Sequence, residues 1–270
     1  MMRAYLIFFG LFGLFVLAPV VNAEPARWRM PVSYIDAIAH KLASNETGCK
    51  SENLLAWHNG EGFASVGIGH FSWYPAGTHN RQGFDQLLDY MRRQQVQIPL
   101  WIAQGNPWRD RDHYLTELAQ GSLRINRLRH WLYATGEVQI RYIIERAIDN
   151  LHDITQRRPD LIPALQRLTQ SADGWFAIID YLNFKGAGLG SRPWGLLHVL
   201  EGVMLLQQDY SPLQAFAISA RIVLENRVRI RPHESRWLPG WVARTTRYWE
   251  GQPECLPATI MTINTRGNYG

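Results

Sequence analysis

The chain has 270 residues and a formal net charge of +5 at neutral pH. This length is enough for one helix-rich domain or for two closely packed lobes. The modest positive charge is compatible with an anionic polymer as a partner, although many exported proteins share it. After the first residues, no segment is apolar for long enough to span a bilayer, which excludes further transmembrane helices.

Residues 1–23 have the pattern of a secretory signal peptide. Arg3 gives a positive start, residues 6–17 are almost wholly apolar, and residues 21–23 (Val-Asn-Ala) offer a cleavage site with small residues. An uncleaved membrane anchor is the alternative, because the apolar run approaches the roughly 20 residues of a span. We expect cleavage after Ala23, a periplasmic or secreted protein, and no stable membrane insertion after cleavage.

Cys49 and Cys255 are the only cysteines of the chain. In an oxidising compartment, two cysteines in a chain of this size more often pair than stay free. We therefore expect a disulfide bond that ties the C-terminal tail to the segment just after Glu46.

Apolar side chains recur at three- and four-residue spacing between residues 32 and 42, which predicts one buried helical face. Pro31 is well placed at the start of this helix, and Gly48 marks its end. The prediction leaves Glu46 at the C-terminal edge of the helix. There the negative end of the helix dipole and partial burial both favour a protonated carboxyl, which is the form that a general acid needs.

The next segment predicts a small hairpin or sheet. Residues 54–57 and 63–67 predict two short strands, and the dipeptides Asn59-Gly60 and Glu61-Gly62 between them are typical of turns. In a flat strand Asn59 and Glu61 would share one face. Trp73 and Tyr74 stand before a polar loop, so we expect this aromatic pair to be exposed.

The rest of the chain is predicted to be helical. Apolar stripes cover residues 84–96, 110–118, 137–154, 160–170, 174–184, 193–207, 212–229 and 239–249. Pro193, Pro212 and Pro239 are expected helix starts. The predicted class is therefore α+β: one mostly helical domain over residues 24–270, with a hairpin lobe at about 46–75 and a helical lobe at about 84–250.

Residues 65–70 (Ser-Val-Gly-Ile-Gly-His) resemble the T-[IV]-G-[IYW]-G-H turn of phage-type lysozymes, with serine in place of threonine. Those enzymes end an N-terminal helix with a glutamate, a position that falls on Glu46, and carry an aspartate at a position that falls on Asn59. A weaker similarity to the helix that closes the lysozyme cleft lies at residues 238–244. The resemblance covers about a fifth of the chain and implies a lysozyme-like fold that cleaves the glycan of peptidoglycan.

The resemblance also implies roles for single residues. Glu46 would be the general acid, and a second group of side chains would position water or stabilise the sugar cation: Asn59, Glu61 and Ser65. Substrate contacts are expected from Trp73, Tyr74, Gly67 and Gly69, since sugar rings stack on aromatic faces and glycines permit close approach. His70 is interpreted as structural, and residues 183–190 as a glycine-rich loop that lines the groove.

Three functions remain open at this point. We expect a muramidase, a glycoside hydrolase that acts as a monomer on peptidoglycan glycan strands without a cofactor. A lytic transglycosylase using the same Glu46 is one alternative. The other is a non-catalytic envelope protein that binds peptidoglycan through a degenerate lysozyme fold, because Asn59 replaces a carboxylate.

Two other classes are not favoured. The spacing of His58, Glu61, His70 and His79 matches no zinc signature, so we expect no metal site. Residues 227–241 carry four arginines and two tryptophans that a nucleic acid could contact: Arg227, Arg229, Arg231, Arg236, Trp237 and Trp241. Export argues against a nucleic-acid partner, and alternating basic residues are usually a solvated face.

Overall fold

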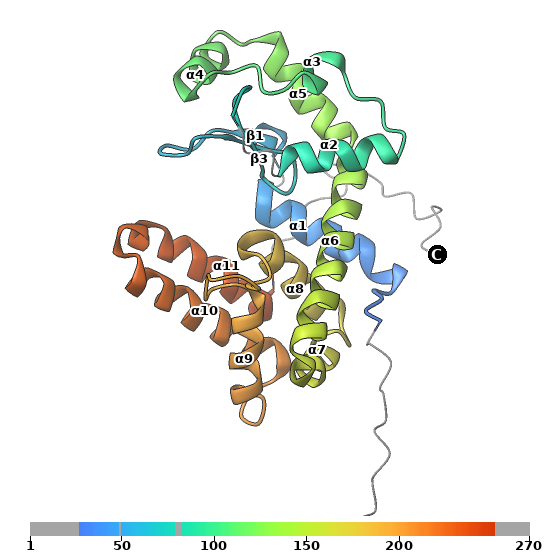
Figure 1. Cartoon of the computed structure of the whole chain (residues 1–270), viewed down its shortest axis with the longest axis vertical. Coiled ribbons are helices and arrows are strands. Elements are labelled where there is room, and N and C mark those ends of the chain that lie inside the picture. The colour runs from blue at the N-terminus through green and yellow to red at the C-terminus, as the bar shows by residue number, and fades with distance from the viewer. Residues whose placement is uncertain (1–26, 49, 79–82, 252–270) are drawn as a thin grey trace, which may run out of the picture.

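The computed structural model describes residues 27–48, 50–78 and 83–251. It is mostly helical with a small three-stranded antiparallel sheet (Figure 1), which confirms the α+β class. The strands are β1 (Leu55–Ala56), β2 (Ala64–Val66) and β3 (Phe71–Trp73). The helices are α1 (Ile35–Thr47), α2 (Phe84–Arg93), α3 (Leu100–Ala103), α4 (Arg111–Ala119), α5 (Leu123–Ala134), α6 (Gly136–Arg157), α7 (Ile162–Leu168), α8 (Ala172–Lys185), α9 (Leu196–Leu206), α10 (Pro212–Ile230) and α11 (Leu238–Glu250).

Figure 1 shows the sheet and α2–α5 at one end of the molecule and α7–α11 at the other. The long helix α6 runs between the two ends, and the C-terminal end of α1 lies next to the sheet. Because α6 and α1 both pack against α8, they join the sheet end to the helical end. This arrangement places the end of α1 where both parts of the chain meet.

The three strands pair in sequence order. Leu55 of β1 lies opposite Val66 of β2, which in turn lies opposite Phe71 of β3. The predicted hairpin is therefore extended by a third strand that the sequence did not predict. Asn59 and Glu61 lie in the loop between β1 and β2, so the expectation that they share a strand face is wrong.

The ends of several helices follow local chemistry. Gly48 caps α1 with a left-handed backbone (φ 55°), as predicted. A capping box formed by Ser211 and Gln214 precedes α10, whose first residue is Pro212. Pro193 was expected to start a helix, but α9 begins only at Leu196, after a loop that leaves α8 at Gly186.

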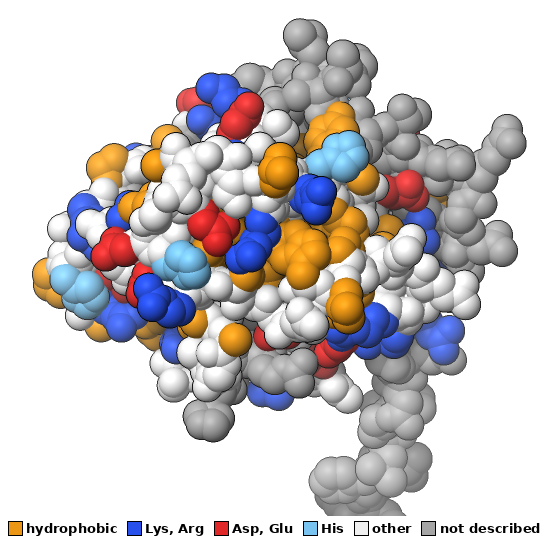
Figure 2. All heavy atoms as spheres, turned by 90° about the horizontal axis from the view of Figure 1, so that it is seen from above, with side chains coloured by type: hydrophobic (Ala, Val, Ile, Leu, Met, Phe, Trp, Pro, Cys, Tyr) orange, Lys and Arg blue, Asp and Glu red, His pale blue; other side chains and the backbone are white. Residues whose placement is uncertain are grey.

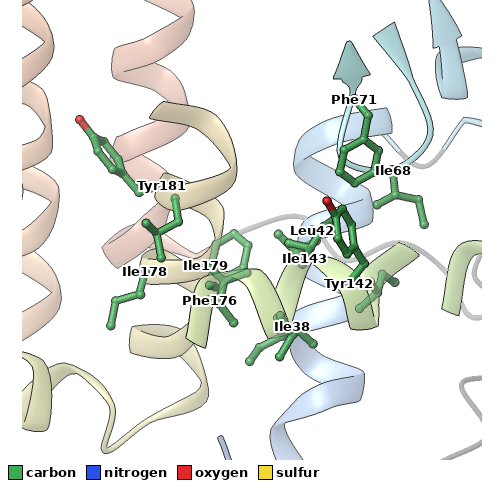
Figure 3. Packing of buried hydrophobic residues seen from close by; sticks show 14 of the residues in the cluster. Ile38, Leu42, Ile68, Phe71, Tyr142, Ile143, Phe176, Ile178, Ile179 and Tyr181 are labelled. Atoms are coloured by element: carbon green, nitrogen blue, oxygen red, sulfur yellow. The ribbon is translucent and has the colours of Figure 1, made fainter. Parts of the chain in front are cut away.

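A continuous cluster of buried hydrophobic residues holds both ends of the molecule together. Figure 3 shows its centre, where side chains from α1, β3, α6 and α8 meet, among them Ile38, Leu42, Phe71, Tyr142, Ile143, Phe176 and Ile179. Burying side chains of this size contributes roughly 1.5–3 kcal/mol each. The core thus fixes the last turn of α1 between the sheet and α8.

Trp73 belongs to this core rather than to the surface. It is 1% exposed, and its ring packs at 5.0 Å from Phe84 and at 6.0 Å from Trp108 (centroid distances). The expectation of an exposed Trp73 is therefore wrong, because β3 points this ring toward α2. Tyr74 is half-buried against Phe63.

The end of the molecule formed by α3, α4 and α5 carries apolar side chains on its surface. Seen from above, hydrophobic side chains gather near the middle of this face between charged ones (Figure 2). Leu100 and Leu123, the first residues of α3 and α5, are 74% and 71% exposed. No helix within the described residues combines the length and the apolarity that crossing a membrane requires.

Some predictions fall outside the described residues. They are the signal peptide and its cleavage site after Ala23, the disulfide between Cys49 and Cys255, and the position of His79. They stay predictions.

Candidate active site

Glu46 lies in the last turn of α1, and its side chain is only 4% exposed. The helix reaches this point because Gly48 ends it two residues later. A carboxyl group buried to this extent needs partners for its oxygens, since an unpaired buried charge is costly. The sequence placed Glu46 correctly at the C-terminal edge of the helix, but it gave no information about those partners.

Two partners come from distant helices. Arg244 of α11 forms an ion pair with Glu46 Oε1. Asn183, near the end of α8, donates a hydrogen bond from Nδ2 to the same oxygen at 3.0 Å, and its Nδ2 also lies 3.4 Å from the carbonyl oxygen of Gly69. Asn183 therefore joins the acid to the turn that follows β2.

Arg244 is itself held by a fully buried carboxylate, Asp180 of α8. The guanidinium donates from Nε to Oδ2 at 2.9 Å and from Nη2 to Oδ1 at 2.7 Å, which is a bidentate pair. Tyr248 donates its hydroxyl to Asp180 Oδ2 at 2.6 Å. Burial and the nearby Asp180 raise the pKa of Tyr248 well above its usual range, so this hydroxyl keeps its proton.

The charge on Arg244 is secured by the same contacts. Burial opposes the charge, but Asp180 and Glu46 together hold the pKa of Arg244 well above its ordinary value. Arg244 therefore presents a fixed positive charge to Glu46.

His70 faces the other oxygen of Glu46. Its Nδ1 lies 3.4 Å from Oε2, and its Nε2 lies 3.2 Å from the carbonyl oxygen of Asn53. Because a carbonyl oxygen only accepts, Nε2 carries a proton, and a neutral ring then presents a bare Nδ1 to the carboxyl. A contact between Nδ1 and Oε2 needs one proton between them, held either by His70 or by Glu46.

The backbone of this turn is constrained by α6. His70 has a positive φ of 46°, and Gly67 has a φ of 76°. Gln139, fully buried on α6, accepts a hydrogen bond from the backbone N–H of Ile68 at 2.8 Å. A Cβ on Gly67 would meet Gln139 Oε1 at 2.4 Å, and a Cβ on Gly69 would meet the Phe71 ring at 2.6 Å. Both glycines are needed for close packing, and Gly67 is buried rather than presented to a substrate.

The other predicted catalytic residues lie apart from this cluster. Ser65 is buried in the middle strand of the sheet, opposite Ala56 on one side and Ser72 on the other. Asn59 is exposed and Glu61 is half-buried, both in the loop between β1 and β2. Within the described residues, no hydrogen bond or ion pair joins any of these three side chains to Glu46.

Glu61 and Asn59 instead line a separate pocket of about 360 Å³. Its other walls come from the start of α4 and the residues before it, including Arg109, Asp110 and Arg111. Glu61 Oε2 is buried there without a hydrogen-bond partner among the described residues. The second carboxylate foreseen from the sequence thus faces α4.

Sequence reasoning missed Asp180 and Tyr248 and assigned no charge role to Arg244. The one available signal was the similarity of residues 238–244 to a cleft-closing helix, which ends on Arg244. Asp180 lies in an apolar stretch of α8, where a lone carboxylate indicates a buried partner. The partner itself lies 64 residues away and is not visible in the pattern.

The described residues contain no group of three or more histidine, cysteine, aspartate or glutamate side chains arranged to hold a metal ion. Comparisons with family models, with curated proteins and with solved structures found no match to this chain. The chemistry of the site must therefore be argued from its own geometry.

Proposed function

We propose that this protein cleaves the glycan backbone of peptidoglycan, with Glu46 as the proton donor. One observation carries the proposal: a buried carboxyl at the end of α1 faces the Gly-x-Gly-His turn after β2, at 3.4 Å from His70. A glycosidic bond breaks when a positioned acid protonates the leaving oxygen.

Arg244 lies next to Glu46 Oε1, where its positive charge offsets the negative charge that develops once the proton has moved to the leaving oxygen. His70 contacts the second oxygen and helps to hold the carboxyl in one orientation. Asn183 fixes the carboxyl against the turn, which keeps the direction of proton transfer constant.

The route after protonation depends on what attacks the sugar. Hydrolysis needs a second group that activates water, and that role was expected of Asn59, Glu61 and Ser65. Asn59 and Glu61 lie in a loop rather than on one strand face, and Ser65 is buried in the sheet. The contacts of Glu46 are with a cation, an amide and an imidazole. This favours the second candidate, a lytic transglycosylase, in which the 6-hydroxyl of the sugar attacks its own anomeric carbon and gives its proton to the Glu46 carboxylate.

The test uses purified sacculi and three forms of the chain: wild type, Glu46→Gln and the matched control Glu52→Gln. Glu52 is an exposed glutamate six positions further on. We expect wild type and the control to release muropeptides, and Glu46→Gln to lose about 100-fold or more in rate with an unchanged circular dichroism spectrum.

The mass of the products separates the two routes. Ends lighter by one water identify 1,6-anhydro sugars and transglycosylation, whereas reducing ends identify hydrolysis. Wild-type rates in folded Glu46→Gln would overturn the proposed mechanism. Binding of sacculi without any release by wild type would instead identify a peptidoglycan-binding protein.

A further inference from the structure

Lys185 is the last residue of α8, two positions after Asn183, and its ammonium group is enclosed by aromatic rings. Its Nζ lies 3.6 Å from the centroid of the Phe184 ring and 3.7 Å from the centroid of the Trp241 ring. Both distances are within the range of cation–π contacts. The ring of Phe184 also lies 4.4 Å from the guanidinium of Arg244, which contacts Glu46. One aromatic ring therefore separates Lys185 from the cation that holds the proposed acid.

The buried cations around Lys185 have carboxylate partners, and Lys185 does not. Arg244 pairs with Asp180, and Arg227 donates from Nη2 to Glu234 at 3.1 Å. Within residues 27–48, 50–78 and 83–251, no salt bridge includes Lys185. No carboxylate of the described residues therefore occupies the Nζ of Lys185, and a carboxylate from outside the chain can pair with it.

The aromatic row continues away from Glu46 toward the sheet. The ring of Trp237 lies 6.2 Å from Trp241 and is 42% exposed, and the guanidinium of Arg236 lies 4.5 Å over it. Arg236 in turn comes within 4 Å of the position that a Cβ on Gly60 would occupy, in the loop between β1 and β2. The row therefore leads from the acid to that loop, and its exposed ring, Trp237, is available for apolar contact with a sugar.

We propose that Lys185 binds a carboxylate carried by the substrate, so that the site prefers acidic glycans over neutral ones of the same length. The assignment rests on the proposed function, because it makes the row of Trp241 and Trp237 part of the same substrate site as Glu46. The ammonium supplies the charge-assisted hydrogen bond, and the two tryptophans supply apolar contact with the sugar.

The electrostatics of Lys185 are consistent with this role. Burial, with Arg227 and Arg244 nearby and Glu234 partly offsetting them, lowers the pKa of Lys185 to about 6. A carboxylate that binds Nζ would restore the charge, so binding takes up a proton near neutral pH. A nucleic acid would suit the row less well, because Glu234 pairs with both Arg227 and Arg231 and places a carboxylate where a phosphate would have to approach.

The experiment measures binding by titration calorimetry in the Glu46→Gln chain, which does not consume its ligand. The probes are chitotetraose, which is neutral, a peptide-free peptidoglycan tetrasaccharide with lactyl carboxylates, and the same tetrasaccharide with its peptides attached. The two acidic probes distinguish a carboxylate on the sugar from one on the peptide. Lys185→Met removes the ammonium, Lys185→Arg keeps a cation, and Lys41→Met is the matched control, since Lys41 also lies over an aromatic ring but pairs with Asp173.

We expect an acidic probe to bind at least about tenfold more tightly than chitotetraose, as a charge-assisted hydrogen bond implies. Lys185→Met should abolish that preference while leaving chitotetraose binding within about twofold, and Lys185→Arg should retain part of it. Lys41→Met should behave like its parent. An unchanged preference in folded Lys185→Met overturns the proposal, as does tighter binding of a single-stranded oligonucleotide than of either acidic probe.

Sacculus clearing by wild type reports the proposed cleavage separately. If wild type fails to clear sacculi but the preference for acidic probes depends on Lys185, the cleavage proposal falls and the binding assignment stands. If wild type clears sacculi normally and shows no preference for acidic probes, the cleavage proposal stands and the binding assignment of Lys185 falls.

Discussion

The cluster around Glu46 and the loop between β1 and β2 both carry side chains expected to be catalytic, and they differ in how those side chains are held. Glu46 is bound by Arg244, Asn183 and His70, which come from three different elements. Glu61 lies in the loop between β1 and β2, and its oxygen Oε2 has no hydrogen-bond partner among the described residues. The difference shows that a motif can place an acid correctly in sequence while the tertiary contacts decide which acid is positioned for catalysis.

The largest effect should follow from breaking the buried pair behind Glu46. Asp180→Asn leaves Arg244 without its bidentate partner, so we expect the free energy of unfolding to fall by about 3–5 kcal/mol. Urea denaturation followed by circular dichroism measures it. Asp173→Asn on the same helix is the control, because Asp173 is half exposed and its pair with Lys41 is at the surface. Similar losses in both variants would contradict the view that the cluster is a buried support.

A smaller effect is expected in the turn between β2 and β3. Gly67→Ala requires a Cβ at 2.4 Å from Gln139 Oε1 and a side chain at a φ of 76°, so unfolding free energy should fall by about 1–3 kcal/mol. A Cβ on Gly62, in the loop between β1 and β2, would meet nothing within 4 Å, so Gly62→Ala should change stability by less than about 0.5 kcal/mol. Thermal melts of both variants measure the difference in stability between them, and equal melting temperatures would contradict the prediction.

Lys185→Met should make the protein more stable, by about 1 kcal/mol at pH 7. The pKa of Lys185 is lowered to about 6 from 10.5, so between these values the unfolded chain binds more protons than the folded one. The contribution of Lys185 to the free energy of unfolding therefore rises as the pH rises from about 6 to about 10.5. Melting temperatures at pH 6, 7, 8 and 9 should show the advantage of Lys185→Met shrinking toward high pH. An advantage that grows with pH would show that the proton linkage has the opposite sign.

The smallest effect is expected at Glu61. Glu61→Gln should change the rate of sacculus cleavage by less than about threefold, because this side chain faces α4 rather than Glu46. Quantified muropeptide release measures it. A loss of about 100-fold would instead assign Glu61 the second catalytic role and restore the hydrolytic route.

Much of the fold could be predicted from the sequence because its signals are local. The stripe of residues 212–229 predicted α10, and Gly48 correctly predicted where α1 ends. Helix α5 (Leu123–Ala134) was missed because its buried face is narrow, formed by Ile125, Leu128 and Leu132, and arginine, asparagine and histidine make the rest of the segment polar. Trp73 was misjudged because a strand of three residues gives too little alternation to show which side is buried.

The site was only half predictable for the same reason. The position of Glu46 depends on one helix and its cap, which are local features. Its partners Asn183 and Arg244 lie 137 and 198 residues away along the chain, and nothing in the local pattern pairs such positions. That Lys185 has no salt bridge among the described residues is even harder to predict from the sequence, because it depends on which neighbouring cations pair with the available carboxylates.

The length of the link between Glu46 and Arg244 also sets the order of events during folding. During synthesis the N-terminal part of the chain is made first, so α1 and the sheet are present early. Arg244, which completes the surroundings of Glu46, is made only with α11, 198 residues later. Closing so long a loop is slow relative to forming local helices. A partly emerged chain therefore holds the acid in an unfinished setting, and the assembled cluster exists only once the whole helical end has packed.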